Sequence, residues 1–302
     1  MSEEKKQESQ SQSQSQSQSQ PKQSKAPTKY KLSHEMNLDV HMCKYEYDEE
    51  RKLLVTAHDD MITLYDTSPQ KKDNPFVKRI QFRPFEATAR SIIKSEANGN
   101  WIVIDHNKTA CILDNNFRFV APIHLPSAAV NIFYGCVAVD GTIHLYCDHR
   151  QQLYAFNAKG EYLPEKSIGC TADDMFYHKD RRQVIVCVAP FDYDDTQKYT
   201  WWVSFYDPTV EECFLGRHEF GDRYQSPKMP RMCHDKKWDR LIFGFDDTVI
   251  ILEFDSYKEV ATFKLQDAKK KGPILRIFTN NDGTIFINTQ MSKMLQVYIP
   301  DN

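Results

Sequence analysis

The chain has 302 residues, of which 40% are hydrophobic and 27% are charged, and its formal net charge is −3 at pH 7. This length is sufficient for one large domain or two ordinary ones, and the near balance of charge excludes a domain that binds nucleic acid through bulk positive charge. Because the sequence contains no run of about 18 apolar residues and no targeting pattern at its N-terminus, we expect a cytoplasmic or nuclear protein without a membrane segment.

The N-terminal segment, residues 1–29, is dominated by a Ser-Gln repeat that is followed by lysines and prolines. Such a segment buries too little apolar surface to offset the conformational entropy of ordering, about 1 to 2 kcal/mol per residue. We therefore predict a disordered tail. Two roles stay open for it, a solvated leader or a segment for weak interaction or phosphorylation.

In residues 30–302, short apolar runs rich in Val, Ile, Phe and Tyr alternate with clusters of Asp, Asn, Gly, Pro and Lys. No stretch keeps a helical period over about 11 to 18 residues, so we predict one all-β domain. Six units share the order apolar strand, polar turn, apolar strand: 52–65, 100–113, 142–156, 183–206, 240–254 and 284–298. They start about 40 to 57 residues apart, a period typical of propeller blades.

Further apolar runs before and after most units predict four strands per blade. The predicted inner strands are 42–47, 90–95, 130–139, 174–177, 231–234 and 275–279, and predicted outer strands are 117–123, 160–168, 213–220 and 259–265. The last unit ends after its third strand, and residues 30–35 are the natural replacement for its missing outer strand. We therefore predict a six-bladed β-propeller closed by this N-terminal strand, because closure removes an exposed sheet edge.

Three units resemble the NHL repeat, in which a glycine precedes the first strand and an Asp with a basic turn follows it. The matching residues are Gly99, Asp105, His106, Asn107 and Lys108; Gly141, Asp148, His149, Arg150, Phe156 and Gly160; and Gly283, Asn288, Lys293 and Val297. The other units are closer to a WD repeat, although they lack its Gly-His and Trp-Asp signatures. The resemblance implies a six-bladed propeller that binds RNA or protein through one face. It does not imply the ligase activity of TRIM-type proteins, because this chain has no RING, B-box or coiled coil.

The predicted binding residues lie on one face of the propeller, which we call the upper face. It carries the loops from each outer strand to the next inner strand and those between second and third strands. The basic and aromatic candidates on these loops are Arg90, His106, Lys108, His149, Arg150, Phe191, Tyr193, Lys228, Arg231, Lys269, Lys270, Lys271 and Lys293. Aromatic rings there would stack on unpaired bases. Acidic residues share the face, so its mixed charge suits a protein partner as well as RNA.

Three functions follow from this pattern. The first is a non-enzymatic scaffold that binds a protein partner, the second is NHL-type RNA binding in post-transcriptional regulation, and the third is a hydrolase or lyase with a metal in its channel. Asp174, His178 and His234 lie near the ends of inner strands, but no acid repeats at one level of the ring, and the chain lacks nucleophile-elbow, P-loop and dinucleotide motifs. The eight cysteines form no C-x-x-C pair, so we expect buried thiols, no metal or cofactor, and a monomer.

Overall fold

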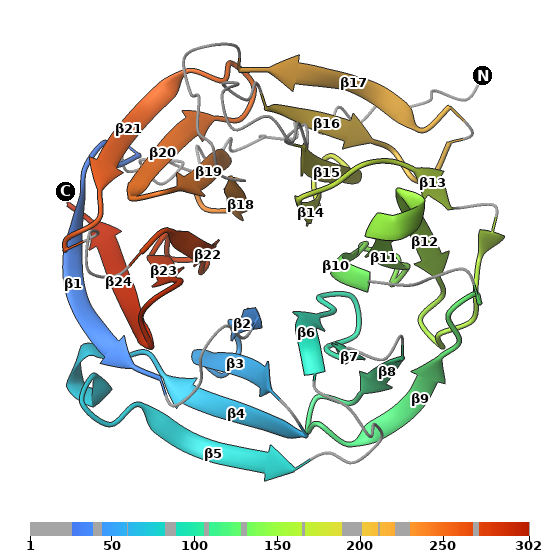
Figure 1. Ribbon diagram of the computed structural model, residues 1–302, viewed down its shortest axis with the longest axis horizontal. Coiled ribbons are helices and arrows are strands. Elements are labelled where there is room, and N and C mark those ends of the chain that lie inside the picture. Colours follow the sequence, from blue (N-terminus) through green and yellow to red (C-terminus); the bar gives the residue numbers. More distant parts are fainter. Residues whose placement is uncertain are drawn as a thin grey trace, which may run out of the picture.

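The computed structural model describes residues 26–38, 44–58, 60–81, 89–105, 109–127, 132–164, 167–188, 201–210, 212–220, 230–267 and 272–301. Residues 1–25 of the predicted tail therefore lie outside the described residues. The described chain forms six four-stranded sheets arranged as blades around a central axis (Figure 1), which confirms the prediction of an all-β six-bladed propeller. Its helical elements within these ranges are two single 3₁₀ turns, η1 (Pro69–Lys71) and η2 (Asp148–Arg150), and none is long and apolar enough to cross a membrane.

In the first five blades, the antiparallel strands follow the sequence from the axis outward. Blades 1 and 2 contain β2 (Lys44–Asp48), β3 (Leu53–His58), β4 (Met61–Asp66), β5 (Phe76–Gln81), β6 (Ala89–Lys94), β7 (Trp101–Asp105), β8 (Ala110–Leu113) and β9 (Phe119–Ile123). Blades 3 to 5 contain β10 (Ile132–Val137), β11 (Ile143–Cys147), β12 (Gln152–Phe156), β13 (Ile168–Gly169), β14 (Asp174–His178), β15 (Gln183–Val188), β16 (Trp202–Tyr206), β17 (Phe214–Glu219), β18 (Arg231–Asp235), β19 (Arg240–Phe245), β20 (Thr248–Glu253) and β21 (Glu259–Lys264).

The sixth blade combines the two ends of the chain. Its inner three strands are β22 (Ile274–Thr279), β23 (Ile285–Thr289) and β24 (Met294–Pro300), and its outer strand is β1 (Tyr30–Asn37). β1 runs antiparallel to β24, from the pair Tyr30 with Pro300 to the pair Asn37 with Met294. The prediction that an N-terminal strand closes the ring is confirmed, and Figure 1 shows β1 beside β24 at the edge of the ring.

The outer strand of blade 3 is shorter than the sequence indicated. The predicted strand spans 160–168, whereas β13 contains only Ile168 and Gly169. Tyr162 forms an isolated bridge with Phe156, and the Leu163 N–H donates to the Ala155 carbonyl at 2.8 Å, but Pro164 has no N–H to donate to a sheet and its carbonyl accepts from the Ser167 N–H at 3.1 Å, so the regular ladder is limited to β13. In blade 1 the sequence assigned no outer strand, and β5 is found there.

The hydrophobic core lies between neighbouring blades, because each sheet packs against the next sheets through both of its faces. Every residue of β7, β8, β11 and β23 is buried. A strand covered on both faces reads as a continuous apolar run and not as an alternating one. The seven described cysteines are free thiols, and six of them are buried in this core.

The turn from the first to the second strand contains one residue with positive φ in every blade. These residues are Gly99, Gly141 and Gly283 at φ +74°, +84° and +75°, and Lys52, Arg182 and Asp239 at φ +58°, +56° and +50°. Glycine meets no steric penalty there, whereas other L-residues do. The glycines of the three NHL-like units thus occupy the same position of this turn. The other three blades have a charged residue at that position.

These turns and the connections from third to outer strands form the lower face, opposite the upper face. Both ends of the described chain lie there. The Asp301 N–H donates to the Lys29 carbonyl at 2.9 Å, and Arg240 Nη1 donates to the Pro27 carbonyl at 2.7 Å. The residues that lead into β1 are therefore attached to the lower side of blade 5.

A chain that begins at residue 39 lacks β1 and should be strongly destabilised. It loses Met36 and Leu38, both fully buried, and burial of two such side chains contributes about 3 to 6 kcal/mol. We expect the Tm to fall by at least about 10 °C, measured by thermal unfolding followed by circular dichroism. A chain that begins at residue 26 is the control and should keep the Tm of the full chain; equal Tm values for all three would show that β1 contributes nothing.

Two glycine substitutions should separate backbone strain from steric overlap. A Cβ at Gly283 would lie 2.0 Å from Cζ3 of Trp238, whereas at Gly99, which has nearly the same φ, the nearest atom is Cγ of Asn115 at 3.9 Å. Gly99→Ala should cost about 1 to 2 kcal/mol of unfolding free energy from the φ angle alone. Gly283→Ala should cost about 1 to 3 kcal/mol more, measured by urea unfolding, and equal losses would contradict the overlap with Trp238.

Candidate functional site

Three of the predicted binding residues are exposed on the upper face. His149 and Arg150 belong to η2, between the second and third strands of blade 3, and Lys293 lies in the corresponding connection of blade 6. Blades 3 and 6 stand on opposite sides of the ring (Figure 1), so the structure does not bring these side chains together. The side chain of Arg90 lies outside the described residues, as do all atoms of His106, Lys108, Phe191, Tyr193, Lys228, Lys269, Lys270 and Lys271.

Arg231 lies in the central channel and not in a loop. It is the first residue of β18 and is half-buried, and its Nη1 donates to the Tyr134 hydroxyl at 3.0 Å and to the Asp173 carbonyl at 3.2 Å. The guanidinium carbon of Arg276 lies 5.9 Å from the centre of the Tyr134 ring, and burial, followed by the charge of Arg231, lowers the pKa of Arg276. These side chains connect blades 3 to 6 across the channel, beside a cavity of about 250 Å³.

A second cavity, of about 660 Å³, opens on the lower face where inner strands end. We call it the lower-mouth cavity. Charged residues of its wall are paired: Lys236 pairs with Glu96, and Lys94 Nζ donates at 2.6 Å to the fully buried Asp48, which also accepts from Arg51 Nη1 at 2.7 Å. Burial alone would raise the pKa of Asp48, but the hydrogen bonds from these two cations hold it below its usual value.

Glu46 of β2 lines both cavities and is the carboxyl group with the most altered acidity there. Burial raises its pKa from 4.5 to about 7, although the charge of Lys236 opposes the shift. The carboxyl oxygen Oε1 accepts only a long hydrogen bond, 3.3 Å, from the Tyr47 N–H among the contacts with described residues. Glu46 is therefore partly protonated near neutral pH.

Two histidines and one aspartate meet at the edge of the lower-mouth cavity. His178 ends β14 in blade 4, His234 lies in β18 of blade 5, and Asp239 occupies the positive-φ position of the following turn. Nε2 of each imidazole lies 2.9 Å from the same oxygen, Oδ1 of Asp239, while Arg181 Nη2 lies 3.3 Å from Oδ2. We call these three residues the His-His-Asp cluster; they are the described residues with the geometry to hold a metal ion.

The cluster has a defined protonation pattern. Burial lowers the pKa of His234 to about 4, so its imidazole is neutral at pH 7. Burial would raise the pKa of Asp239, but the hydrogen bonds from His178 and His234 hold it below its usual value. Because an ionised carboxylate oxygen can only accept hydrogen bonds, Nε2 of both imidazoles donates to Oδ1 of Asp239 in this arrangement, and the backbone N–H of Arg181 lies 3.4 Å from Nδ1 of His178.

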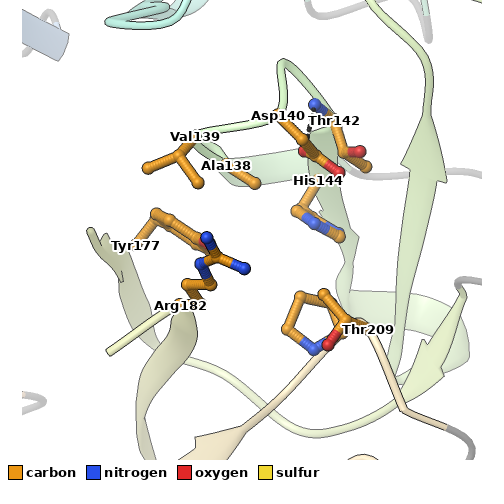
Figure 2. Close-up of a pocket in the computed structure, with 9 residues that line it drawn as sticks. Ala138, Val139, Asp140, Thr142, His144, Tyr177, Arg182 and Thr209 are labelled. Atoms are coloured by element: carbon orange, nitrogen blue, oxygen red, sulfur yellow. Dashed lines mark hydrogen bonds between the residues drawn. The ribbon is translucent and has the colours of Figure 1, made fainter. Parts of the chain in front are cut away.

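A third cavity, of about 290 Å³, lies on the lower face between blades 3 and 4. Figure 2 shows the Arg182 guanidinium against the ring of Tyr177 and directed towards the fully buried His144. On the opposite wall, Asp140 Oδ1 accepts from the Thr142 N–H at 2.9 Å. Within the described part of the chain, the Arg182 guanidinium makes no hydrogen bond or ion pair, so it is available to a group that enters the cavity.

The lower-face residues were largely missed by the sequence interpretation. His178 and His234 were noted at strand ends, but Asp239 and Arg182 were not. The signal was present, because both occupy the turn position at which three other blades have glycine. A charged residue that accepts positive φ carries a conformational cost, which is typical of functional positions.

Comparison with known proteins identifies the fold but no family. No model of a known protein family matches the sequence, and no curated protein matches it. One similar solved structure is described as the crystal structure of the WD40 beta propeller domain of Doa1, with a TM-score of 0.59, 11% identity, and coverage of 86% of this chain and 78% of that chain. The chain is thus a six-bladed propeller similar in structure to a WD40 propeller, and the resemblance to NHL repeats stays a prediction from the sequence.

The raised pKa of Glu46 makes stability depend on pH in a defined direction. As pH rises from 4.5 to 7, Glu46 loses its proton in the unfolded chain before it does so in the native state, so the unfolding free energy decreases over this range. Above pH 7 Glu46 is ionised in both states, and the unfolding free energy does not decrease further on its account. Glu46→Gln removes the cost of burying an ionised carboxylate and should raise the unfolding free energy at pH 8 by about 1 to 3 kcal/mol. At pH 4, where Glu46 is protonated in both states, the substitution should give no gain. Urea unfolding at both values tests this, with the exposed Glu50→Gln as control; an equal gain at both pH values would contradict it.

Proposed function

We propose that the protein is a non-enzymatic interaction scaffold that binds a protein partner through its lower face. The observation that carries the proposal is a set of exposed apolar side chains at the lower ends of outer strands. They come in adjacent pairs at the starts of three of these strands: Phe76 and Val77, Phe119 and Val120, and Phe214 and Leu215, each 43% to 54% exposed.

The position of these pairs has a simple cause. Neighbouring residues of a strand point to opposite faces of the sheet, and the outer end of a blade extends beyond the blades on both sides. Both members of a pair therefore stay in contact with solvent. Single exposed apolar residues are ordinary on protein surfaces, but adjacent pairs that recur on three blades resemble the apolar contacts of an interface.

The cavity between blades 3 and 4 also favours the lower face as the binding surface. It offers the Arg182 guanidinium, which has no hydrogen-bond partner among the described residues, together with the apolar side chain of Val139, which is 37% exposed. A cavity of about 290 Å³ is suited to one side chain of a partner and not to an extended ligand. A non-enzymatic role is also supported by the sequence, which contains no nucleophile-elbow, P-loop or dinucleotide-binding motif.

The upper face remains the alternative location, as the sequence predicted. His149, Arg150 and Lys293 are the exposed described candidates there. The propeller fold by itself does not indicate which face binds a partner, because proteins with this fold have many functions. RNA binding is the competing ligand class for that face, and it would weaken steeply with salt.

Matched variants of the full chain test the choice of face. The lower-rim variant carries Phe119→Ser with Phe214→Ser, and the upper-face variant carries Arg150→Glu with Lys293→Glu; all four positions are exposed, so both should keep the Tm of the wild type. We expect proteins captured from nuclease-treated extract by the immobilised wild type to decrease at least about 10-fold on the lower-rim variant, as expected from truncated interface residues. The upper-face variant should retain them.

Two outcomes would overturn this proposal. Loss of captured proteins from the upper-face variant alone would restore the sequence-based assignment. Capture that disappears after nuclease treatment, together with salt-sensitive retention of a random RNA pool, would favour RNA binding instead.

A further inference from the structure

Two imidazole nitrogens and one carboxylate oxygen converge in the His-His-Asp cluster. Nε2 of His178 and Nε2 of His234 each lie 2.9 Å from Oδ1 of Asp239, and all three atoms lie within 4.8 Å of one another. Bond lengths of about 2.0 to 2.2 Å place the ligands of a tetrahedral zinc ion about 3.4 Å apart. An ion bound between these atoms would replace the two hydrogen bonds and open each Nε2–Oδ1 separation from 2.9 Å to about 3.4 Å.

Aromatic side chains hold both imidazole rings in place. Phe176 stacks on His234, with ring centres 5.3 Å apart and planes at 7°, and the Phe254 ring meets His178 edge-on with centres 4.6 Å apart. The two imidazole rings are themselves 4.3 Å apart. Since packing already fixes these rotamers, little side-chain entropy remains to be lost when an ion binds.

Asp239 is held as a ligating carboxylate would be. Arg181 binds Oδ2 and also pairs with Asp255 at 2.7 Å, which leaves Oδ1 directed at the imidazoles. Hydrogen bonds to the second oxygen of a carboxylate ligand are a regular feature of metal sites. All three cluster residues line the lower-mouth cavity, so a fourth coordination position would face open space.

Two features oppose a bound cation. The positive charge of Arg181 lies next to Asp239 and would weaken the attraction. An imidazole bound through Nε2 carries its proton on Nδ1, so His178 would lose its contact with the Arg181 N–H. That contact is 3.4 Å long, beyond the usual 2.7 to 3.2 Å, and the Asp239 side chain is 45% exposed, so solvent screens the guanidinium.

We propose that His178, His234 and Asp239 bind one zinc ion, which joins blades 4 and 5 at the lower face and leaves one coordination position open to the lower-mouth cavity. Two imidazoles and one carboxylate suit zinc, whereas calcium and magnesium take oxygen ligands. The inference is independent of partner binding and stands if that proposal fails.

The test uses the full chain, freed of metal with a chelator and then titrated with Co²⁺ and Zn²⁺. We expect about one ion per chain by calorimetry, visible absorption bands of four-coordinate cobalt that zinc abolishes, and a Tm that rises with zinc concentration. Asp239→Asn should lower zinc affinity at least about 10-fold, because the amide has lost the carboxylate charge. His149→Ala removes an exposed upper-face histidine and should leave the titration unchanged.

His234→Gln distinguishes a metal site from a hydrogen-bonded cluster. The glutamine amide can still donate to Asp239 but is a poor zinc ligand, so the zinc-free Tm should stay close to that of the wild type while the zinc-induced rise disappears. Absence of zinc binding by the wild type would overturn the proposal. Equal binding by the wild type, Asp239→Asn and His234→Gln would also overturn it, because the ion would then lie elsewhere.

Discussion

The pairing of β1 with β24 is the interaction on which the rest of the structure depends. A ring of sheets is stable only if the last blade presents a complete face to the first, and here three strands from the C-terminal end require a fourth from the N-terminal end. Met36 and Leu38, at the upper end of β1, pack with Tyr47, Leu54 and Phe286, so closure also completes the core between blades 6 and 1. Each cavity described above has walls from more than one blade, and its shape depends on that closure.

The sequence was sufficient for the architecture because the relevant signals are local and periodic. Apolar runs separated by short polar turns give the strands, their spacing gives six blades, and a missing outer strand at the end of the chain identifies its replacement. The errors occur where a local feature interrupts the pattern. Pro164 shortened the outer strand of blade 3, and β5 was missed because its six residues include no fully buried side chain.

The site was harder to infer, because it depends on how blades meet. His178 and Asp239 are 61 positions apart in the chain and contact each other only because blade 4 packs on blade 5. Arg231 shows the same limit: the sequence placed it at the start of an inner strand and counted it with the upper-face loops, but did not predict that its guanidinium donates to the Tyr134 hydroxyl on blade 3. Spacing along the chain places a residue at a strand end, but it does not say which neighbouring side chain it will face.

The meeting of both chain ends in one blade has a topological consequence. Because the Asp301 N–H reaches the Lys29 carbonyl, a short peptide that joined these two residues would close the propeller domain into a circle without moving a strand, and the circle could be reopened at another turn. The order of the blades is then a cyclic order, with no blade required to be first. The composite sixth blade marks the point at which the chain enters and leaves the ring.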